Sequence, residues 1–405
     1  MTVAPPAPLV VVTNWGVAAL PLVGGVLLAS AVCAVPYWRA LRQTYPVSLK
    51  TSCAAAAVAL AAAWFVPVLF SSDVYAYAAY GEMARIGLNP YALAPLDASD
   101  GLVRAAQVQW GTAFPICLYG PAFVAFARFM VTTLAPLGPL AQLNAFRIAA
   151  SAAFLICMPL AYFAFQGDRT ERLRAAATIG LNPAAIWCAA EGHNDAMALA
   201  VLLAGFALAR RRILNAGAAV VALSSMIKPP GIAAAIGLAI VDRRARVGAL
   251  AGIAIAVALS FPLIAGVATQ LAPHGTYAPQ ASLQAIFRPL GPFVSCAAAL
   301  VAGALLARRG VTLLAGRNIE GWIWLGLTAW VLVPNPYPWY ALWLVALAAL
   351  APRSRAGAVA ILLSLTAMLR YVPDTIAIPS PPLAVALGIA ATLPLLALCY
   401  NERPA

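Results

Sequence analysis

Runs of apolar residues recur along almost the whole chain, separated by short breaks that are rich in charge or proline. A helix that crosses the hydrocarbon core of a bilayer needs roughly 17–25 mainly apolar residues, and most of the runs come near that length. We find no stretch long and polar enough for a separate soluble domain. The pattern therefore predicts an all-α, polytopic membrane protein in which residues 1–405 form a single transmembrane domain.

The predicted full spans number about eleven. They lie at residues 15–36, 51–70, 144–165, 175–190, 194–209, 247–265, 291–307, 320–334, 338–351, 356–372 and 382–400. Two or three further pieces are expected to be short re-entrant or broken helices, at 119–134, 213–227 and 231–241. Sixteen helical residues reach only about 24 Å, which is short of the hydrocarbon core. Proline ends a helix, so Lys228-Pro229-Pro230 is expected to break the last two pieces apart.

Composition agrees with a membrane protein, because 64% of the residues are hydrophobic and only 9% are charged. The net charge of +13 would suggest nucleic acid in a soluble protein, but most of the basic residues lie in short loops between the spans. An excess of Lys and Arg marks cytoplasmic loops, so we expect an extracytoplasmic N-terminus and no nucleic acid partner. The seven cysteines are scattered, mostly in apolar runs, and predict neither a disulfide framework nor a zinc site.

The basic loops also fix the expected orientation of the remaining segments. With the C-terminus inside, the loops predicted to face outward are 71–118, 191–195, 266–290, 335–338 and 373–380. Most of the scarce acidic residues, together with His193 and His274, lie on that side. Any chemistry is therefore expected on the outer face, and short loops favour a bacterial inner (plasma) membrane.

The longest of these loops, 71–118, begins with a carboxylate backed by aromatic residues. Asp73, Tyr77 and Tyr80 share one helical face at i, i+4 and i+7. A carboxylate at a membrane exit suits a general base that takes a proton from a sugar hydroxyl. The alternatives are that Asp73 caps a helix and that the tyrosines belong to the membrane interface.

The second concentration of polar residues is the turn Glu191-Gly192-His193-Asn194-Asp195. Carboxylates and a histidine at a bilayer exit are costly unless they are paired or solvated, which favours a binding site. Asn194 or Asp195 could instead cap the next helix. Glu191, His193 and Asp195 could also bind a metal ion, although their spacing matches no specific metal motif.

Lys228 stands alone in an apolar stretch, and an isolated charge at membrane depth indicates a functional site. Its expected partner is an anion such as a lipid phosphate, and the alternative is a lysine that snorkels to the head groups. Further basic residues could complete a phosphate site: Arg85, Arg104, Arg128, Arg147, Arg288 and Arg370. Tyr337 and Trp339, in a proline-rich turn, could stack on a sugar or belong to the interfacial aromatic belt.

At these places the chain resembles the GT-C glycosyltransferases, and it is most similar to polyprenol-phosphomannose-dependent α-1,6-mannosyltransferases. The matching stretches occur in the family's order over about residues 51–345. They are Asp73-Val-Tyr-Ala-Tyr with Gly81-Glu82 and Gly87-Leu-Asn-Pro-Tyr91, Tyr119-Gly-Pro121, Asn182-Pro183, Glu191-Gly-His-Asn-Asp195, Lys228-Pro-Pro230 and Tyr337-Pro-Trp-Tyr340.

The resemblance implies a catalytic Asp73, inverting transfer of a hexose, most readily mannose, and a polyprenyl-phosphate sugar as donor. The acceptor would be a glycolipid or glycan, and no metal or other cofactor would be obligatory, with a divalent metal left possible. Substrate-binding residues in these stretches would be Tyr77, Tyr80, Glu82, Tyr119, Glu191, His193, Asn194, Asp195, Lys228, Tyr337 and Trp339. Of the basic residues outside the stretches, Arg288 and Arg370 are also expected to bind substrate. Two alternatives stay open, a transporter or flippase of lipid-linked sugars and a GT-C transferase that uses another sugar donor.

Overall fold

The computed structural model describes residues 20–43, 46–66, 73–92, 116–270, 279–376 and 381–399. Helices account for 83% of these residues, and no β-strand occurs among them. The predicted all-α class is therefore confirmed. Much of the predicted loop 71–118, together with Arg104 and His274, lies outside the described residues.

By their contacts the helices group into two compact units. The first unit takes residues 1–13, 60–164 and 189–276, and the second takes residues 14–59, 165–188 and 277–405. Each unit therefore combines segments that are far apart in the chain. That the whole chain acts as one transmembrane domain stays a prediction.

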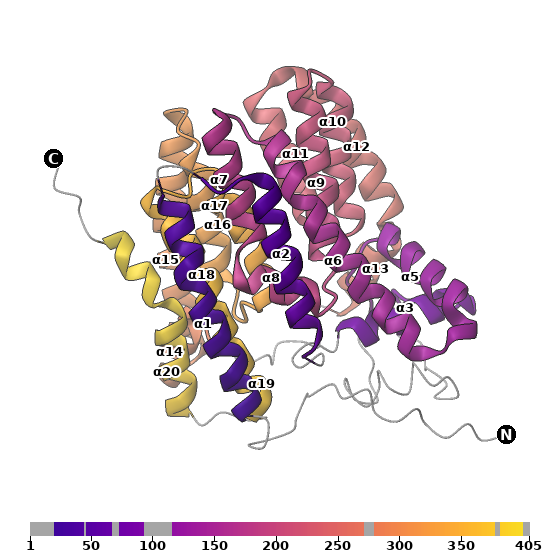
Figure 1. Ribbon diagram of the computed structural model, residues 1–405, viewed down its shortest axis with the longest axis horizontal. Coiled ribbons are helices and arrows are strands. Elements are labelled where there is room, and N and C mark those ends of the chain that lie inside the picture. The colour runs from indigo at the N-terminus through magenta and orange to yellow at the C-terminus, as the bar shows by residue number, and fades with distance from the viewer. Residues whose placement is uncertain are drawn as a thin grey trace. The chain divides into compact units, whose positions relative to one another are not determined.

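The first unit holds the end of α2 and eight further helices among the described residues (Figure 1). They are α2 (Leu49–Trp64), α3 (Asp73–Arg85), α5 (Pro121–Leu134), α6 (Pro139–Ala164), α9 (Asp195–Arg210), α10 (Leu214–Leu223), α11 (Pro230–Val241), α12 (Arg246–Leu259) and α13 (Phe261–Gln270). Proline is the first residue of α5, α6 and α11, where its missing N–H costs nothing because the first turn of a helix leaves that group unpaired.

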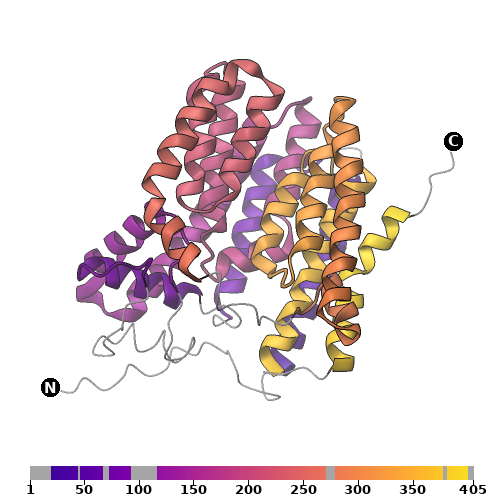
Figure 2. The same cartoon turned by 180° about the vertical axis from the view of Figure 1, so that it is seen from behind.

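Helices α9, α10, α11 and α12 pack side by side, as both ribbon views show (Figures 1 and 2). Small residues allow this close approach. A Cβ added to Gly217 would lie 2.5 Å from the backbone nitrogen of Ala209, and one added to Gly248 would lie 1.9 Å from the carbonyl oxygen of Asn215. Glycine at such contacts lets apolar helices approach backbone to backbone, a packing mode typical of membrane helices.

The second unit contains most of α2 and the remaining helices. They are α1 (Leu20–Arg42), α7 (Arg169–Gly180), α8 (Pro183–Ala190), α14 (Leu283–Phe287), α15 (Pro292–Ala315), α16 (Glu320–Leu332), α17 (Ala341–Ala348), α18 (Arg355–Thr366), α19 (Tyr371–Ile376) and α20 (Pro381–Thr392), with the last two residues of α8 in the first unit. Short 3₁₀ turns extend or link helices in both units, at Ala135–Leu137, Ser224–Met226, Arg243–Ala245, Arg288–Leu290, Pro338–Tyr340, Ala367–Arg370 and Leu393–Cys399.

A buried amide organises the core of the second unit. The Nδ2 of Asn182 donates to the Oγ of Ser364 at 2.8 Å, and its Oδ1 accepts from the backbone N–H of Ala185 at 3.0 Å. The hydroxyl of Tyr37 donates to the carbonyl of Thr178 at 2.8 Å. Asn182 is completely buried, and both ends of its amide are used for structure.

Five helical segments in the described part of the chain are long and apolar enough to cross a membrane, or six if the bent pair α8 and α9 counts as one span. The five are Leu20–Arg42, Pro139–Ala164, Pro292–Ala315, Arg355–Pro373 and Pro381–Cys399. Large apolar side chains such as Leu28 and Phe293 are exposed on them, as expected for a protein that faces lipid. The membrane character is confirmed, whereas the count of about eleven spans is not.

Two of the predicted spans are not continuous helices. The expected span 175–190 is divided between α7 and α8, and the expected span 247–265 is divided at Ser260 between α12 and α13. The sequence carries a proline at each break, since Pro183 opens α8 and Pro262 is the second residue of α13. Proline fits the first turn of a new helix better than the interior of a long one.

Candidate active site

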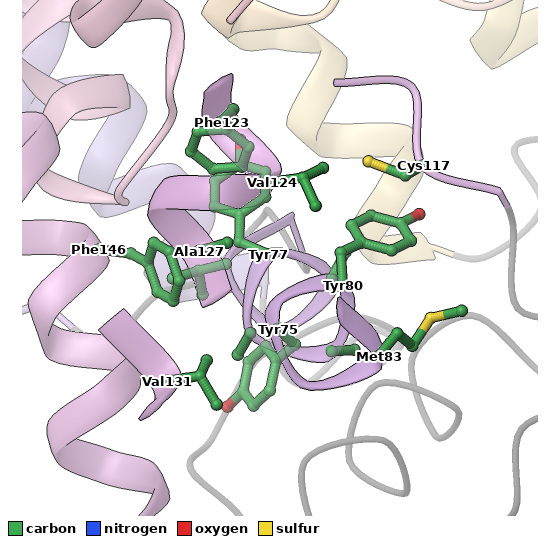
Figure 3. Close-up of a cluster of buried hydrophobic side chains, with 14 of the residues drawn as sticks. Tyr75, Tyr77, Tyr80, Met83, Cys117, Phe123, Val124, Ala127, Val131 and Phe146 are labelled. Carbon is green, nitrogen blue, oxygen red and sulfur yellow. The ribbon is translucent and has the colours of Figure 1, made fainter. Parts of the chain in front are cut away.

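Helix α3 is buried along most of its length. Every residue from Asp73 to Met83 is buried, and Tyr77 packs against rings of α5 and α6 whereas Tyr80 lies toward Cys117 (Figure 3). The ring of Tyr77 makes edge contacts with Phe123 and Phe146, at centroid distances of 4.7 and 5.9 Å. These contacts fix the start of α3, and with it the position of Asp73.

Asp73 is the first residue of α3 and is only 7% exposed. Its Oδ2 accepts a hydrogen bond from the hydroxyl of Tyr119 at 3.2 Å and lies 3.5 Å from the Nδ1 of His193. Burial alone would raise the pKa of this carboxyl. The imidazole of His193, the charge of Lys228 and the Tyr119 hydroxyl outweigh burial and hold the pKa of Asp73 below its ordinary value.

His193 lies between two carboxylates in the turn that joins α8 to α9. Gly192 makes this turn with φ +95°, a left-handed conformation that favours glycine. The Nε2 of His193 is 3.8 Å from the Oε2 of Glu191, opposite its contact with Asp73. Burial opposes the charged form, but hydrogen bonding and attraction to both carboxylates raise the pKa of His193 to about 9. The two carboxylates therefore favour the protonated form of His193.

The end of α8 is held by side chains from α6. The Nε of Arg147 donates to the carbonyl of Ala190 at 2.8 Å, and its guanidinium stacks over the ring of Trp64 at 4.3 Å. The Oγ of Ser151 donates to the carbonyl of Ala189 at 3.3 Å and accepts from the indole N–H of Trp64 at 3.1 Å. Arg147, a candidate phosphate ligand by sequence, thus fixes the turn that presents His193. Trp64 and Ser151 give no signal in the sequence, because both lie in apolar helices.

Lys228 lies in the break between α10 and α11 and pairs with Asp195. Its Nζ lies 2.5 Å from the Oδ2 of Asp195 and 5.8 Å from the ring centroid of Tyr119. Lys228 is only 9% exposed. The sequence predicted an anion partner or a snorkelling lysine, and the anion that the structure shows is a side chain of the protein. Backbone contact between Gly120 and residues 226–227 holds this segment next to Tyr119.

Asn194 occupies the N-cap position of α9 and is completely buried. Its backbone N–H donates to the hydroxyl of Tyr77 at 3.4 Å. Its side chain makes no capping bond, and neither amide atom has a hydrogen-bond partner in the described part of the protein. The capping role expected as one alternative is therefore not taken by this side chain.

These residues form one cluster within the first unit: Asp73, Tyr119, Arg147, Glu191, His193, Asn194, Asp195 and Lys228. Most of the buried charges in it face an opposite charge, as buried charges must to be tolerated. The carboxylate in this cluster can accept a proton from an alcohol. The cation beside it can bind an anionic group of a substrate, and the hydroxyl and amide groups can bind polar ones.

A family model described as "Alpha-(1->6)-mannopyranosyltransferase, N-terminal domain" (the MptA_B family) matches residues 4–244, which is more than half of the chain and includes the whole cluster. The chain belongs to this family. Alpha-(1->6)-mannopyranosyltransferase A of Mycobacterium tuberculosis (strain ATCC 25618 / H37Rv) is 38% identical in an alignment of 73 positions that covers 16% of this chain and 14% of that protein. No solved structure matches the chain. The resemblance that the motifs indicated is thereby confirmed, as membership of a glycosyltransferase family.

Glu82 and Tyr80, two further predicted site residues in this unit, each have a partner outside the cluster around Asp73. The carboxylate of Glu82 pairs with Arg85 on the next turn of the helix, with Nε and Oε2 2.6 Å apart. The hydroxyl of Tyr80 donates to the carbonyl of Ile116 at 3.2 Å. These contacts stabilise α3 and the segment before α5.

The remaining predicted site residues belong to the second unit, beyond the matched residues 4–244. The rings of Tyr337 and Trp339 stack face to face, with centroids 4.5 Å apart. The guanidinium of Arg370 lies 4.7 Å from the Tyr337 centroid, and Arg370 is buried. Arg288 is exposed in a 3₁₀ turn. The structure therefore brings three of the four together as one aromatic and cationic cluster.

The turn 191–195 carries three candidate metal ligands, Glu191, His193 and Asp195. Among the described residues, no group of three or more His, Cys, Asp or Glu side chains is placed to hold a metal ion. His193 uses both of its ring nitrogens toward Asp73 and Glu191.

Proposed function

We propose that the chain is a membrane glycosyltransferase that moves a hexose, mannose in the first instance, from a polyprenyl-phosphate sugar to a glycolipid or glycan acceptor. Membership of the mannopyranosyltransferase family supports the class of reaction. The apolar helices support a donor that is itself anchored in the membrane. The observation that carries the proposal is the buried Asp73 carboxylate, whose Oδ2 lies 3.2 Å from the Tyr119 hydroxyl and 3.5 Å from the Nδ1 of His193.

In the proposed reaction, Asp73 accepts the proton of the acceptor hydroxyl as that oxygen attacks the anomeric carbon. The bond between this carbon and the phosphate oxygen breaks, and the electron pair leaves with the polyprenyl phosphate. A single displacement inverts the anomeric configuration, so a β-phosphomannosyl donor would give an α-linked product. The reaction calls for no oxidant and no obligatory metal, because a phosphate monoester is already a reasonable leaving group.

Lys228 is proposed to hold the phosphate as its charge develops. In the structure its ammonium group lies near Tyr119, the residue that also donates to Asp73. A preorganised cation in a dry site stabilises a developing anion more strongly than the same cation in water. The distribution of Lys and Arg between the loops supports an active site that faces the extracytoplasmic side of the plasma membrane.

The test is transfer of radiolabelled mannose from synthetic polyprenyl-phosphomannose to a mannoside by the purified wild type and Asp73→Asn. Loss of the general base should lower the rate about 10²–10⁴-fold. Asp168→Asn is a matched control, because Asp168 is an exposed N-cap of α7 and asparagine also serves as an N-cap. This control should transfer mannose at the wild-type rate.

Near-normal transfer by Asp73→Asn would refute the role of Asp73. If the wild type binds the donor but transfers no mannose, a panel of other polyprenyl-phosphate sugars tests for another donor. Movement of the intact lipid-linked sugar across vesicles would favour the transporter. The anomeric configuration of the product, read by NMR, tests inversion separately.

A further inference from the structure

The side chain of Asn194 is a completely buried amide at the start of α9. Its carboxamide can donate two hydrogen bonds and accept two, yet none of these is made within the described part of the protein. Buried polar groups are nearly always hydrogen-bonded, so an amide that is completely buried and unpaired requires an explanation.

The local structure does not use this side chain, although its position is well fixed. Asparagine at an N-cap normally accepts a bond from a backbone N–H of the first helical turn, and Asn194 does not. Its backbone is anchored instead, through the bond from its N–H to the Tyr77 hydroxyl at 3.4 Å. Tyr77 in turn is locked between aromatic rings of α5 and α6. The amide is thus preorganised, and its hydrogen-bonding capacity is unused among the described residues.

The neighbours of Asn194 in the chain face the two groups that the proposed reaction uses. His193, one residue before, contacts Asp73, and Asp195, one residue after, holds Lys228. The Tyr77 that anchors the Asn194 backbone also touches the ring of Tyr119, the hydrogen-bond donor to Asp73. A sugar ring whose reacting carbon lies between the base and the phosphate would therefore present its hydroxyls close to this turn.

A neutral amide differs chemically from its neighbours. The carboxylates of Asp73 and Asp195 can only accept hydrogen bonds, and Lys228 can only donate them. A carboxamide presents a donor and an acceptor side by side, which matches two adjacent hydroxyls on a pyranose, since each hydroxyl can do either.

We propose that Asn194 recognises the sugar, with its Nδ2 and Oδ1 hydrogen-bonded to neighbouring hydroxyls of a pyranose ring. The inference rests on the proposed function and deepens it by naming a specificity-determining residue. The ring belongs either to the sugar of the donor or to the acceptor, and both offer the same chemistry. Removing one hydroxyl from such a site leaves a protein group unpaired, and discrimination of this kind is large.

The first experiment compares the stability of two asparagine variants in detergent without substrate. Asn194→Ala removes an amide that makes no hydrogen bond to the described residues, so the melting midpoint of this variant should equal or exceed that of the wild type. Asn182→Ala is the matched control, because Asn182 is equally buried but its amide bonds to Ser364 and Ala185. The midpoint of Asn182→Ala should fall by several degrees. An equal fall for Asn194→Ala would identify Asn194 as a structural residue and would overturn the proposal.

The second experiment asks whether Asn194 recognises particular hydroxyls. Transfer by the wild type and by Asn194→Ala is measured with polyprenyl-phosphomannose and its monodeoxymannosyl analogues, and then with methyl α-mannoside and its monodeoxy analogues as acceptors. For the hydroxyls that Asn194 binds, the wild type should lose at least tenfold in kcat/KM, and Asn194→Ala should lose little further. If kcat/KM falls only with the donor analogues, Asn194 binds the sugar of the donor. If kcat/KM falls only with the acceptor analogues, Asn194 binds the acceptor.

Equal penalties in wild type and variant at every hydroxyl would overturn the assignment of Asn194. Failure of the proposed function is distinguishable, because the wild type would then transfer no mannose at all. In that case saturation-transfer NMR measures binding of the same methyl mannosides to the wild type and to Asn194→Ala. Stronger binding by the wild type than by Asn194→Ala supports the proposal, and equal binding overturns it.

Discussion

Replacing His193 by glutamine should move the acidic limb of the pH–rate profile to higher pH. Asp73 must be ionised to accept a proton, so kcat/KM falls as the pH drops through the pKa of this carboxyl. In the wild type, the imidazolium of His193 lies 3.5 Å from Asp73 and helps to hold that pKa down against the effect of burial. Glutamine keeps much of the size of the side chain but carries no charge.

The size of the pKa shift follows from the 3.5 Å contact between His193 and Asp73. An opposite charge within about 4–6 Å typically shifts a carboxyl pKa by about one to three units. Lys228 and Tyr119 still favour the anion in the variant, so the shift of the acidic limb should lie in the lower part of that range. Glu191 adds to it, because the two carboxylates then face the same neutral side chain. The sign is upward, which means that activity is lost at a higher pH than in the wild type.

The assay is mannose transfer in detergent, measured as kcat/KM over the acid and neutral range. Tyr119→Phe is the control, because it removes the 3.2 Å hydrogen bond to Asp73 without removing a charge. Its acidic limb should move in the same direction by less. A profile of His193→Gln that has the shape of the wild-type profile at a lower plateau would refute the electrostatic role of His193.

Three further changes test the contacts around this cluster. Lys228→Met should weaken donor binding. The double variant Lys228→Met/Asp195→Asn should melt at a higher temperature than either single variant, because each single variant leaves one buried charge without its partner. Arg147→Ala should cost about 1.5–3 kcal/mol of stability by freeing the carbonyl at the end of α8, measurable by denaturation in detergent. Gly120→Ala should lower transfer at least tenfold, because its Cβ would lie 2.2 Å from a carbonyl oxygen of the segment before Lys228, whereas Gly24→Ala, with open space around it, should transfer normally.

The helices were largely predictable because their signals are local. The expected pieces 119–134 and 231–241 correspond to α5 at Pro121–Leu134 and α11 at Pro230–Val241. In both, an apolar run is opened by proline, which determines where the helix begins. The break at Asn182 was missed, because an apolar run continues through it and the side chain that stabilises the break bonds to Ser364, far along the chain. Periodicity cannot report a contact of that range.

The site was predictable only as a set of residues. Asp73, Lys228 and the turn 191–195 stand out because polar groups are scarce in this chain and costly in a membrane. Their pairing was not predictable, because Asp195 meets Lys228 across 33 positions and Asp73 meets Tyr119 across 46. The sequence also could not show that Arg147 serves the turn, since an arginine in an apolar helix is equally compatible with a phosphate site.

The partners found in the structure separate affinity from specificity in the proposed reaction. A donor phosphate must share Lys228 with Asp195, its partner at 2.5 Å, so part of the phosphate attraction offsets the loss of an existing ion pair. Sugar hydroxyls that reach Asn194 displace no protein contact of its amide, because the described structure shows none. The bare polyprenyl phosphate should therefore bind less tightly than its charge suggests. Hydrogen bonds to the sugar would make the sugar-bearing donor bind more tightly than the bare polyprenyl phosphate. The polyprenyl phosphate released by the transfer would then leave the site readily.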